Sequence, residues 1–373
     1  MTEIWNTEMT DDLPALVANA ERADDEPWDG LCVPDTQSRS PEAFVSLTAM
    51  AMRTSRIGLG IGVTNPVTRH PALLASASVT LQRVSGGRFT LGIGRGDSAA
   101  AHVGAAPVTP TRFDHYVRVL RAYLHRQTVD IDEAHQFVAG TVPHVDTLGL
   151  ASNPERSEIQ WMGDQDVPVP LEIAGSGPKV LGLSAVLSDR PAIAVGAVPE
   201  RVAWAIEIVR NARKTAQLDP DVGICCYVNV VAHHDPLVAQ RLVRAVLPST
   251  SRFSVMQGTV NGPTDGASAE ILEGIRASYS MAAHGTLGSK PGELLTQEFT
   301  DAYSVAGTPE HCVDRLRTLA DLGVDKFVLF PIGRKVDPEE VAVARRVMTH
   351  EVAPFFSASM ARTGHSPMTR KDA

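Results

Sequence analysis

Basic tracts, long apolar runs and aromatic residues are all scarce in this sequence. The net charge is −9 and only 5% of the residues are aromatic, so neither a basic patch nor a stacking platform for nucleic acid is expected. No apolar run is long enough to span a bilayer, so no membrane partner is expected. The acidic start, MTEIWNTEMTDD, lacks the charged-then-apolar pattern of an export signal. These absences predict a cytoplasmic protein.

Cysteine is also scarce, with four residues and no CxxC spacing. Cys225 and Cys226 are adjacent on an expected strand, where neighbouring side chains point to opposite faces, and buried reduced thiols are the expectation. The histidines show no HExxH, and His233 and His234 diverge at a strand end, so no metal site is expected. The GxSxG pattern of hydrolases is absent as well.

Apolar segments bounded by turn residues alternate with helical patterns along most of the chain. The expected strands are residues 3–6, 30–33, 57–63, 89–93, 169–173, 192–195, 223–231 and 327–330. The expected helices are residues 13–23, 41–52, 71–83, 112–126, 178–187, 199–216, 236–246, 309–322 and 338–350. Eight strands in this alternation predict an α/β fold of the (β/α)8 TIM-barrel type. An open doubly wound sheet would alternate in the same way but would not predict the number eight.

The length of 373 residues accommodates either one barrel with insertions or two domains. The alternation favours one barrel domain over residues 1–356. Two segments, about 127–167 and 247–306, interrupt the rhythm with prolines and glycines, and loops of this length are typically lids or binding elements. Residues 357–373 are small and polar and are expected to form a flexible tail.

Polar, glycine-spaced turns follow the two strands around residues 57–63 and 89–93. Thr64 and Asn65 end the first strand, and Arg95 and Asp97 follow the second. Ligands bind at the carboxyl ends of strands in parallel α/β folds, so these turns are the first candidates for a site. Glycines inside a strand, such as Gly62, mark a bulge or the close approach of a ligand, or they serve strand packing alone.

Another glycine turn, AGSGPK at residues 174–179, follows the expected fifth strand and opens a helix. Free amides at a helix N-terminus can hold a phosphate group, and Lys179 would add a positive charge. The spacing is not a GxGxxG fingerprint, and a tight turn that simply needs glycine remains the alternative.

Several segments together resemble the bacterial luciferase-like family of flavin- and deazaflavin-dependent oxidoreductases, nearest to the branch that includes methylenetetrahydromethanopterin reductase. The segments are RIGLGIGVTNPVTRHP (56–71), SGGRFTLGIGRGDS (85–98), WDGLCVPD (28–35), AGSGPK (174–179) and AGTPEHCVDRLRTLADLGVDKFVLFP (306–331). The resemblance implies a luciferase-like TIM barrel that is commonly a homodimer. It also implies hydride transfer to or from a small organic substrate, with the deazaflavin F420 favoured by the TNPVTRHP run.

Two other functions remain open under the same resemblance. One is an FMN-dependent monooxygenase that works with a separate flavin reductase. Flavin reacts with oxygen, whereas the deazaflavin has carbon at position five and reacts with oxygen poorly. An enzyme that uses F420 would have an F420 reductase as its partner instead. The other is a non-catalytic flavin-binding protein, because fold does not guarantee activity.

The resemblance also implies roles for individual residues. It predicts a cis peptide between Gly62 and Val63 beneath the central ring of the cofactor. The predicted cofactor-binding residues are Gly62, Val63, Thr64, Asn65, Arg95, Gly175, Ser176, Gly177 and Lys179. Thr36 stands where the family often has histidine, so a mechanism based on that histidine is not expected.

Asp97, Asp35 and His70 are the candidate catalytic residues. Asp97 occupies the place of a carboxylate near the reactive ring in similar enzymes and could relay protons, or it could cap a short helix at 99–101. Asp35 could order the edge of the cofactor or substrate, or cap the next loop. His70, with Arg69 before it, could contact the cofactor or be an ordinary loop residue.

Overall fold

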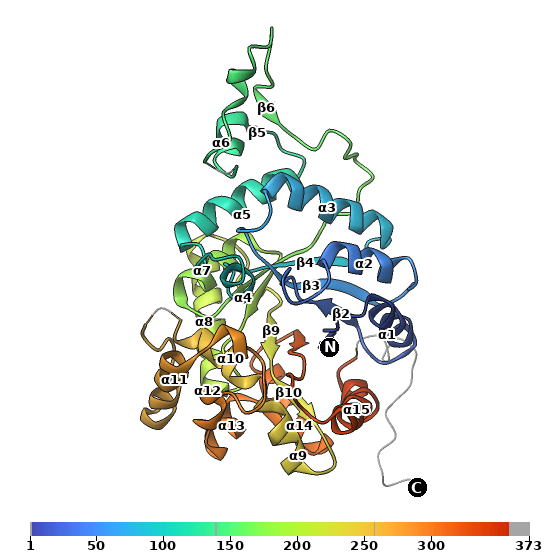
Figure 1. Ribbon diagram of the computed structural model, residues 1–373, viewed down its shortest axis with the longest axis vertical. Helices are drawn as coiled ribbons and strands as arrows, with labels where there is room; N and C mark the ends of the chain where they lie inside the picture. Colours follow the sequence, from blue (N-terminus) through green and yellow to red (C-terminus); the bar gives the residue numbers. More distant parts are fainter. Residues whose placement is uncertain (1, 139, 257, 358–373) are drawn as a thin grey trace.

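The computed structural model describes residues 2–138, 140–256 and 258–357. Eight parallel strands close into a barrel in the order β1-β12-β9-β8-β7-β4-β3-β2, which confirms the predicted fold (Figure 1). They are β1 (Glu3–Thr7), β2 (Gly30–Val33), β3 (Gly58–Thr64), β4 (Phe89–Ile93), β7 (Leu171–Gly175), β8 (Arg190–Ile193), β9 (Cys225–Val228) and β12 (Lys326–Leu329).

Helices surround the barrel and cover the outward side chains of its strands, which form one large apolar core with them. They are α1 (Leu13–Asp25), α2 (Ala43–Ala51), α3 (Pro71–Val84), α5 (Pro110–Leu124), α7 (Pro178–Leu187), α8 (Pro199–Thr215), α9 (Pro236–Val243), α14 (Pro309–Asp321) and α15 (Pro338–Val347). Most begin with proline, whose missing N–H is not needed in the first turn of a helix. After α15 the chain continues through η4 (Met348–Val352) and η5 (Ala353–Phe355).

One predicted strand proved to be two. The chain leaves the barrel after Val228, and β10 (Val230–Ala232) pairs instead with β11 (Val305–Gly307). The buried Asn229 marks the break, and its carbonyl accepts a hydrogen bond from the amide of Val305 at 2.9 Å. The prediction of a continuous strand over 223–231 was therefore wrong: the polar Asn229 interrupts the apolar run, and the chain leaves the barrel at this residue.

Side chains fill the amino-terminal end of the barrel, at which its strands begin. Trp5 lies inside the strands, and a Cβ added to Gly30 or Gly58 would come within 2.2 or 2.7 Å of its ring. Strand packing therefore explains these two glycines. Beneath the indole, the Lys326 Nζ lies 3.5 Å from the ring centroid and 2.8 Å from a carboxylate oxygen of Glu172.

The cysteines behave as predicted. All four are buried and free. Cys225 packs with Trp5 inside the barrel, whereas Cys226 belongs to the outer core beneath the helices. The alternation of a strand thus sends adjacent thiols to opposite sides of the barrel wall.

The first insertion, between α5 and β7, projects beyond α3 and α5 (Figure 1). It contains β5 (Val129–Asp130) paired with β6 (Arg156–Ser157), together with α6 (Ile131–His135) and η1 (Val145–Leu148). Its predicted breakers agree with this irregular structure.

The second insertion, 247–306, contains several short helices where the sequence suggested a long loop. They are α10 (Leu247–Ser251), η2 (Arg252–Ser254), α11 (Gly266–Ser278), η3 (Met281–Ala283), α12 (Lys290–Glu293) and α13 (Gln297–Tyr303). Apolar side chains of these helices form a separate cluster that includes Leu272, Phe299 and Tyr303. In the predicted tail, Ser357 is buried, and residues 358–373 lie outside the described residues.

Candidate functional site

A cavity of about 290 Å³ lies at the carboxyl ends of the barrel strands. Its wall is formed by the turns after seven of the strands and by the second insertion, which covers one side of the mouth. Apolar side chains such as Val63, Phe253, Met256 and Phe330 make up much of the lining. The cavity is therefore suited to a largely apolar ligand that meets a few polar groups at its edges.

Most of the predicted site residues meet in this cavity. Those that line it are Asp35, Gly62, Val63, Thr64, Asn65, Arg95, Asp97, Gly175, Ser176 and Gly177. The Gly62–Val63 peptide is cis, as predicted. It lies within a register shift of β3 against β4, between Ile61 and Thr64.

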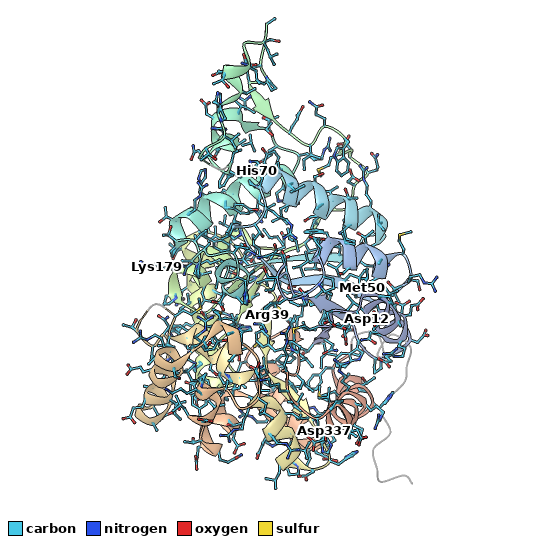
Figure 2. The ribbon with its side chains drawn as sticks, viewed as in Figure 1. Asp12, Arg39, Met50, His70, Lys179 and Asp337 are labelled. Carbon is cyan, nitrogen blue, oxygen red and sulfur yellow. The ribbon has the colours of Figure 1, made fainter. Side chains whose placement is uncertain are left out.

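Two predicted residues do not line the cavity. His70 is the N-cap of α3: its Nδ1 accepts the amide of Ala72 at 3.1 Å, and its Nε2 is hydrogen-bonded to the Ala134 carbonyl at 2.9 Å. Both ring nitrogens are thus engaged by the backbone, which favours the loop interpretation over catalysis. Lys179 is exposed on the first turn of α7 at the edge of the molecule, because the helix turns it away from the mouth (Figure 2).

Asp35 is the centre of a buried polar network. The Thr64 hydroxyl donates to its carboxylate at 2.6 Å, and Arg69 forms an ion pair with it. Arg69 also pairs with Glu42 and lies over the ring of Phe44. Asp35 therefore joins the turns after β2 and β3, and the structure supports neither the capping role for it nor a direct contact of Arg69 with a ligand.

Asp97 stands at the N-cap of α4 (Ser98–Ala101), but its side chain does not cap that helix. It forms an ion pair with Arg252 of the second insertion, and Arg252 lies over the ring of Tyr279 at 4.4 Å. The pair attaches the insertion to the turn after β4. This contact favours a positioning role for Asp97 over a proton relay, because the carboxylate is held by a cation.

Tyr227 was missed by the sequence reasoning. It is 4% exposed on β9, and its hydroxyl oxygen would lie 3.3 Å from a Cβ on either Gly62 or Gly92. Burial raises the pKa of Tyr227 well above its ordinary value, so the hydroxyl stays protonated. Among the described residues, neither this hydroxyl nor the amide nitrogen of Asn65 has a hydrogen-bond partner. Both atoms belong to residues that line the cavity, and neither donor is used by the described part of the chain.

The turn of Gly175, Ser176 and Gly177, called the 175–177 turn below, lies at one side of the mouth. Gly177 is the N-cap of α7 and provides no side chain to the free amides of the first turn. A Cβ on Gly177 would have the Asn261 amide nitrogen of the insertion as its nearest neighbour, at 3.5 Å, so the space in front of the turn is open. The Ser176 hydroxyl donates to the Phe253 carbonyl at 2.9 Å.

Arg201 on α8 holds this part of the insertion and was also missed. It is 0% exposed. Its guanidinium donates to the carbonyls of Val195, Pro263 and Asn261 and to the hydroxyls of Ser254 and Thr264, at 2.6–3.0 Å. No sequence motif identifies such a residue, because its acceptors lie far along the chain.

The described part of the chain contains no group of three or more His, Cys, Asp or Glu side chains placed to hold a metal ion. Its helices are all too short or too polar to cross a membrane.

Comparisons with known proteins place these observations in a family. The model described as luciferase-like monooxygenase matches residues 2–326. The chain is 28% identical to 5,10-methylenetetrahydromethanopterin reductase of Methanolobus tindarius over 322 residues, which cover 84% of this chain and 89% of that protein.

Two solved structures share the fold. The coenzyme F420-dependent tetrahydromethanopterin reductase of Methanopyrus kandleri has a TM-score of 0.69 and 22% identity, with 95% of this chain and 99% of that chain covered. The oxygenating constituent of 3,6-diketocamphane monooxygenase of Pseudomonas putida, in complex with FMN, has a TM-score of 0.62 and 16% identity, with 95% and 98% covered.

Proposed function

Because this chain belongs to the luciferase-like monooxygenase family, we propose that it is an oxidoreductase that uses the deazaflavin F420 for hydride transfer to or from a small organic substrate. The observation that carries the proposal is the cavity, in which the predicted glycine turns meet around an apolar interior. The choice of F420 is supported by the likeness to the reductase of Methanolobus tindarius over 84% of this chain.

The residues of the cavity fit a tricyclic ring with a phosphate-bearing side chain. The 175–177 turn offers free amides at a helix N-terminus, which stabilise a phosphate group. The unpartnered donors on Tyr227 and Asn65 suit the polar edge of the ring, and Val63 and Phe330 suit its faces.

Each part of the site has a separate task in this proposal. The bound deazaflavin supplies the hydride chemistry. The turns after β3 and β7 would orient the ring, Tyr227 holds a proton at its hydroxyl oxygen, and the second insertion excludes water from one side of the mouth. The Asp35 network and the Asp97–Arg252 pair fix the turns that carry these groups.

FMN is the second candidate cofactor. The fold shared with the FMN complex from Pseudomonas putida favours it, since that barrel holds a flavin. An FMN enzyme would consume oxygen and depend on a separate flavin reductase, whereas an F420 enzyme would transfer hydride without oxygen. Oxygen uptake therefore distinguishes the two.

The test is a titration of the purified protein with F420 and with FMN, followed by fluorescence, for the wild type and two alanine variants. Gly177→Ala places a methyl group in the open space before the phosphate turn, where alanine has an allowed conformation. Gly182→Ala is the matched control, because it lies on the same helix with no atom near the added Cβ and does not line the cavity.

We expect F420 to bind the wild type and the Gly182→Ala variant equally and the Gly177→Ala variant about tenfold more weakly, a change of about 1.4 kcal/mol. Reduced F420 is then mixed with ketones, imines and alkenes, and oxidation of the cofactor is recorded. Micromolar FMN binding with substrate-dependent oxygen uptake would replace F420 by FMN. Cofactor binding without any turnover would favour the non-catalytic alternative.

A further inference from the structure

The charged side chains around the cavity leave an excess of positive charge. Two carboxylates line it, Asp35 and Asp97, and each is paired with an arginine. Three arginines also line it: Arg39, Arg95 and Arg334. Among the residues that the structure describes, none of these three forms an ion pair with a carboxylate. The net charge of the chain is −9, so the local excess does not follow from composition.

Arg39 and Arg334 share one corner of the mouth. The Arg39 Nη2 donates to the carbonyl of His284 at 2.9 Å, and the amide of Arg334 donates to the carbonyl of Gly285 at 2.6 Å. Burial, together with the charge of Arg334, lowers the pKa of Arg39 below its ordinary value. The Arg334 Nη2 lies 3.5 Å from the Arg39 carbonyl oxygen, so the two arginines are neighbours, and no carboxylate among the described residues forms an ion pair with either. Figure 2 places Arg39 near the centre of the view, away from the edge where Lys179 lies.

This corner lies across the mouth from the 175–177 turn. In the barrel order, β1 is four strands from β7 in either direction, and β1 is flanked by β2 and β12. Arg39 follows β2 and Arg334 follows β12, whereas Arg95 follows β4, directly beside β7. A cofactor phosphate in the 175–177 turn therefore leaves Arg39 and Arg334 at the opposite side of the cavity.

We propose that Arg39 and Arg334 bind a carboxylate or phosphate group of the substrate. The inference rests on the proposed function, because it assigns the 175–177 turn to the cofactor. A guanidinium presents two parallel N–H donors that match the two oxygens of such a group. The His284 ring lines the same corner. Burial and the charges of Arg39 and Arg252 lower the pKa of His284 to about 3, so the arginines alone carry the charge there at neutral pH.

The experiment measures binding of malonate and of inorganic phosphate by calorimetry, with F420 saturating, to the wild type, Arg39→Gln, Arg334→Gln and the double variant. Arg276→Gln is the control for net charge, because Arg276 is an exposed arginine of α11 outside the cavity. F420 affinity is measured for every variant. Circular dichroism checks the fold, and Arg39→Lys and Arg334→Lys replace any glutamine variant that fails to fold, since lysine keeps the charge but loses the paired donors.

We expect both anions to bind the wild type and Arg276→Gln alike, and about tenfold more weakly after each single glutamine substitution, since hydrogen bonds to charged groups are strong. The lysine variants are expected to bind less tightly than the wild type, and F420 affinity is expected to stay unchanged. Equal anion binding by the wild type and the double variant would overturn the proposal. A parallel loss of F420 affinity would overturn it as well, because the arginines would then hold the anionic end of the cofactor.

The anion site can still be tested if the proposed F420-dependent function is wrong. If F420 does not bind the wild type, the same titrations are made without cofactor in the Gly177→Ala background, in which a methyl group narrows the phosphate turn. A loss of malonate binding on Arg39→Gln or Arg334→Gln then still supports an oxyanion site at this corner, and unchanged binding overturns it.

Discussion

Replacing Arg201 by methionine is expected to loosen the second insertion while leaving the barrel intact. Methionine keeps an unbranched side chain in the buried position but removes all five guanidinium hydrogen bonds. Four of the acceptors lie in the insertion, on Ser254, Asn261, Pro263 and Thr264. The substitution is therefore expected to destabilise mainly the second insertion.

The size of the effect follows from the burial of the guanidinium. A hydrogen bond to a charged group contributes about 1.5–3 kcal/mol, and because the five contributions do not add, the total loss is expected to be about 3 kcal/mol or more. We expect the free energy of local opening around residues 254–264 to fall by about that amount. Lysine cannot restore it, since a single ammonium group does not reach all five acceptors.

Hydrogen exchange followed by mass spectrometry measures this effect directly. Protection of the Gly258 and Asn261 amides, which donate to the carbonyls of Val255 and Ser254, is expected to fall strongly in Arg201→Met, whereas peptides from β3 and β4 keep theirs. Arg210→Met is the control, because Arg210 is an exposed arginine of the same helix. Cofactor affinity is expected to fall with the protection, since Phe253 and Asn261 line the cavity.

Unchanged exchange at 258–264 together with a lower melting temperature of the whole protein would refute this reasoning. Arg201 would then stabilise the barrel through Val195 and α8, and the insertion would be held by its apolar cluster alone.

Three further predictions concern buried groups. Tyr227→Phe is expected to leave thermal stability within about 1 kcal/mol, because its hydroxyl has no partner among the described residues, and yet to weaken F420 in titrations; a large loss of stability would contradict this. Glu172→Gln leaves the buried Lys326 without its anion and should cost about 3–5 kcal/mol in urea unfolding, most of it recovered when Lys326→Met is added. Because the pKa of His284 is about 3 in the folded protein, the unfolded chain binds more protons below about pH 6.5, so stability should fall as the pH drops from there, and less steeply in His284→Gln.

The barrel could be predicted because its local signals agree with one another. The strands at Gly30–Val33 and Phe89–Ile93 and the helix at Pro178–Leu187 have the bounds that glycine, proline and apolar periodicity indicated. The strand β8 begins two residues earlier than predicted, at Arg190, and includes Pro191, a residue type that argues against a strand in the sequence.

The second insertion could not be predicted in the same way. Apart from α11 its helices are short, and short helices owe their stability to packing more than to propensity. α11 follows the breakers Asn261, Gly262 and Pro263 and begins with a glycine, so its start is not evident until the cap at Asp265 and the apolar cluster are seen.

The site was predicted where it depends on turns and missed where it depends on contacts across the fold. Asn65 after β3 and the glycines of the 175–177 turn after β7 are residue types that indicate a turn in the sequence itself. Tyr227 reads as an ordinary strand residue, because only the register of β9 in the barrel turns its hydroxyl towards the cavity. Lys179 follows the right turn, but the direction of α7 points it to the surface.

Trp5 has a consequence for the order in which molecules can enter and leave. The indole and the Lys326–Glu172 pair fill the amino-terminal end of the barrel, so the cavity is reached from the carboxyl ends of the strands. A molecule that binds next to Tyr227 must therefore enter before a second molecule that covers it, and it can leave only after that second molecule has left. Steady-state kinetics with two reactants should therefore show an ordered mechanism, in which the more deeply bound molecule binds first and dissociates last.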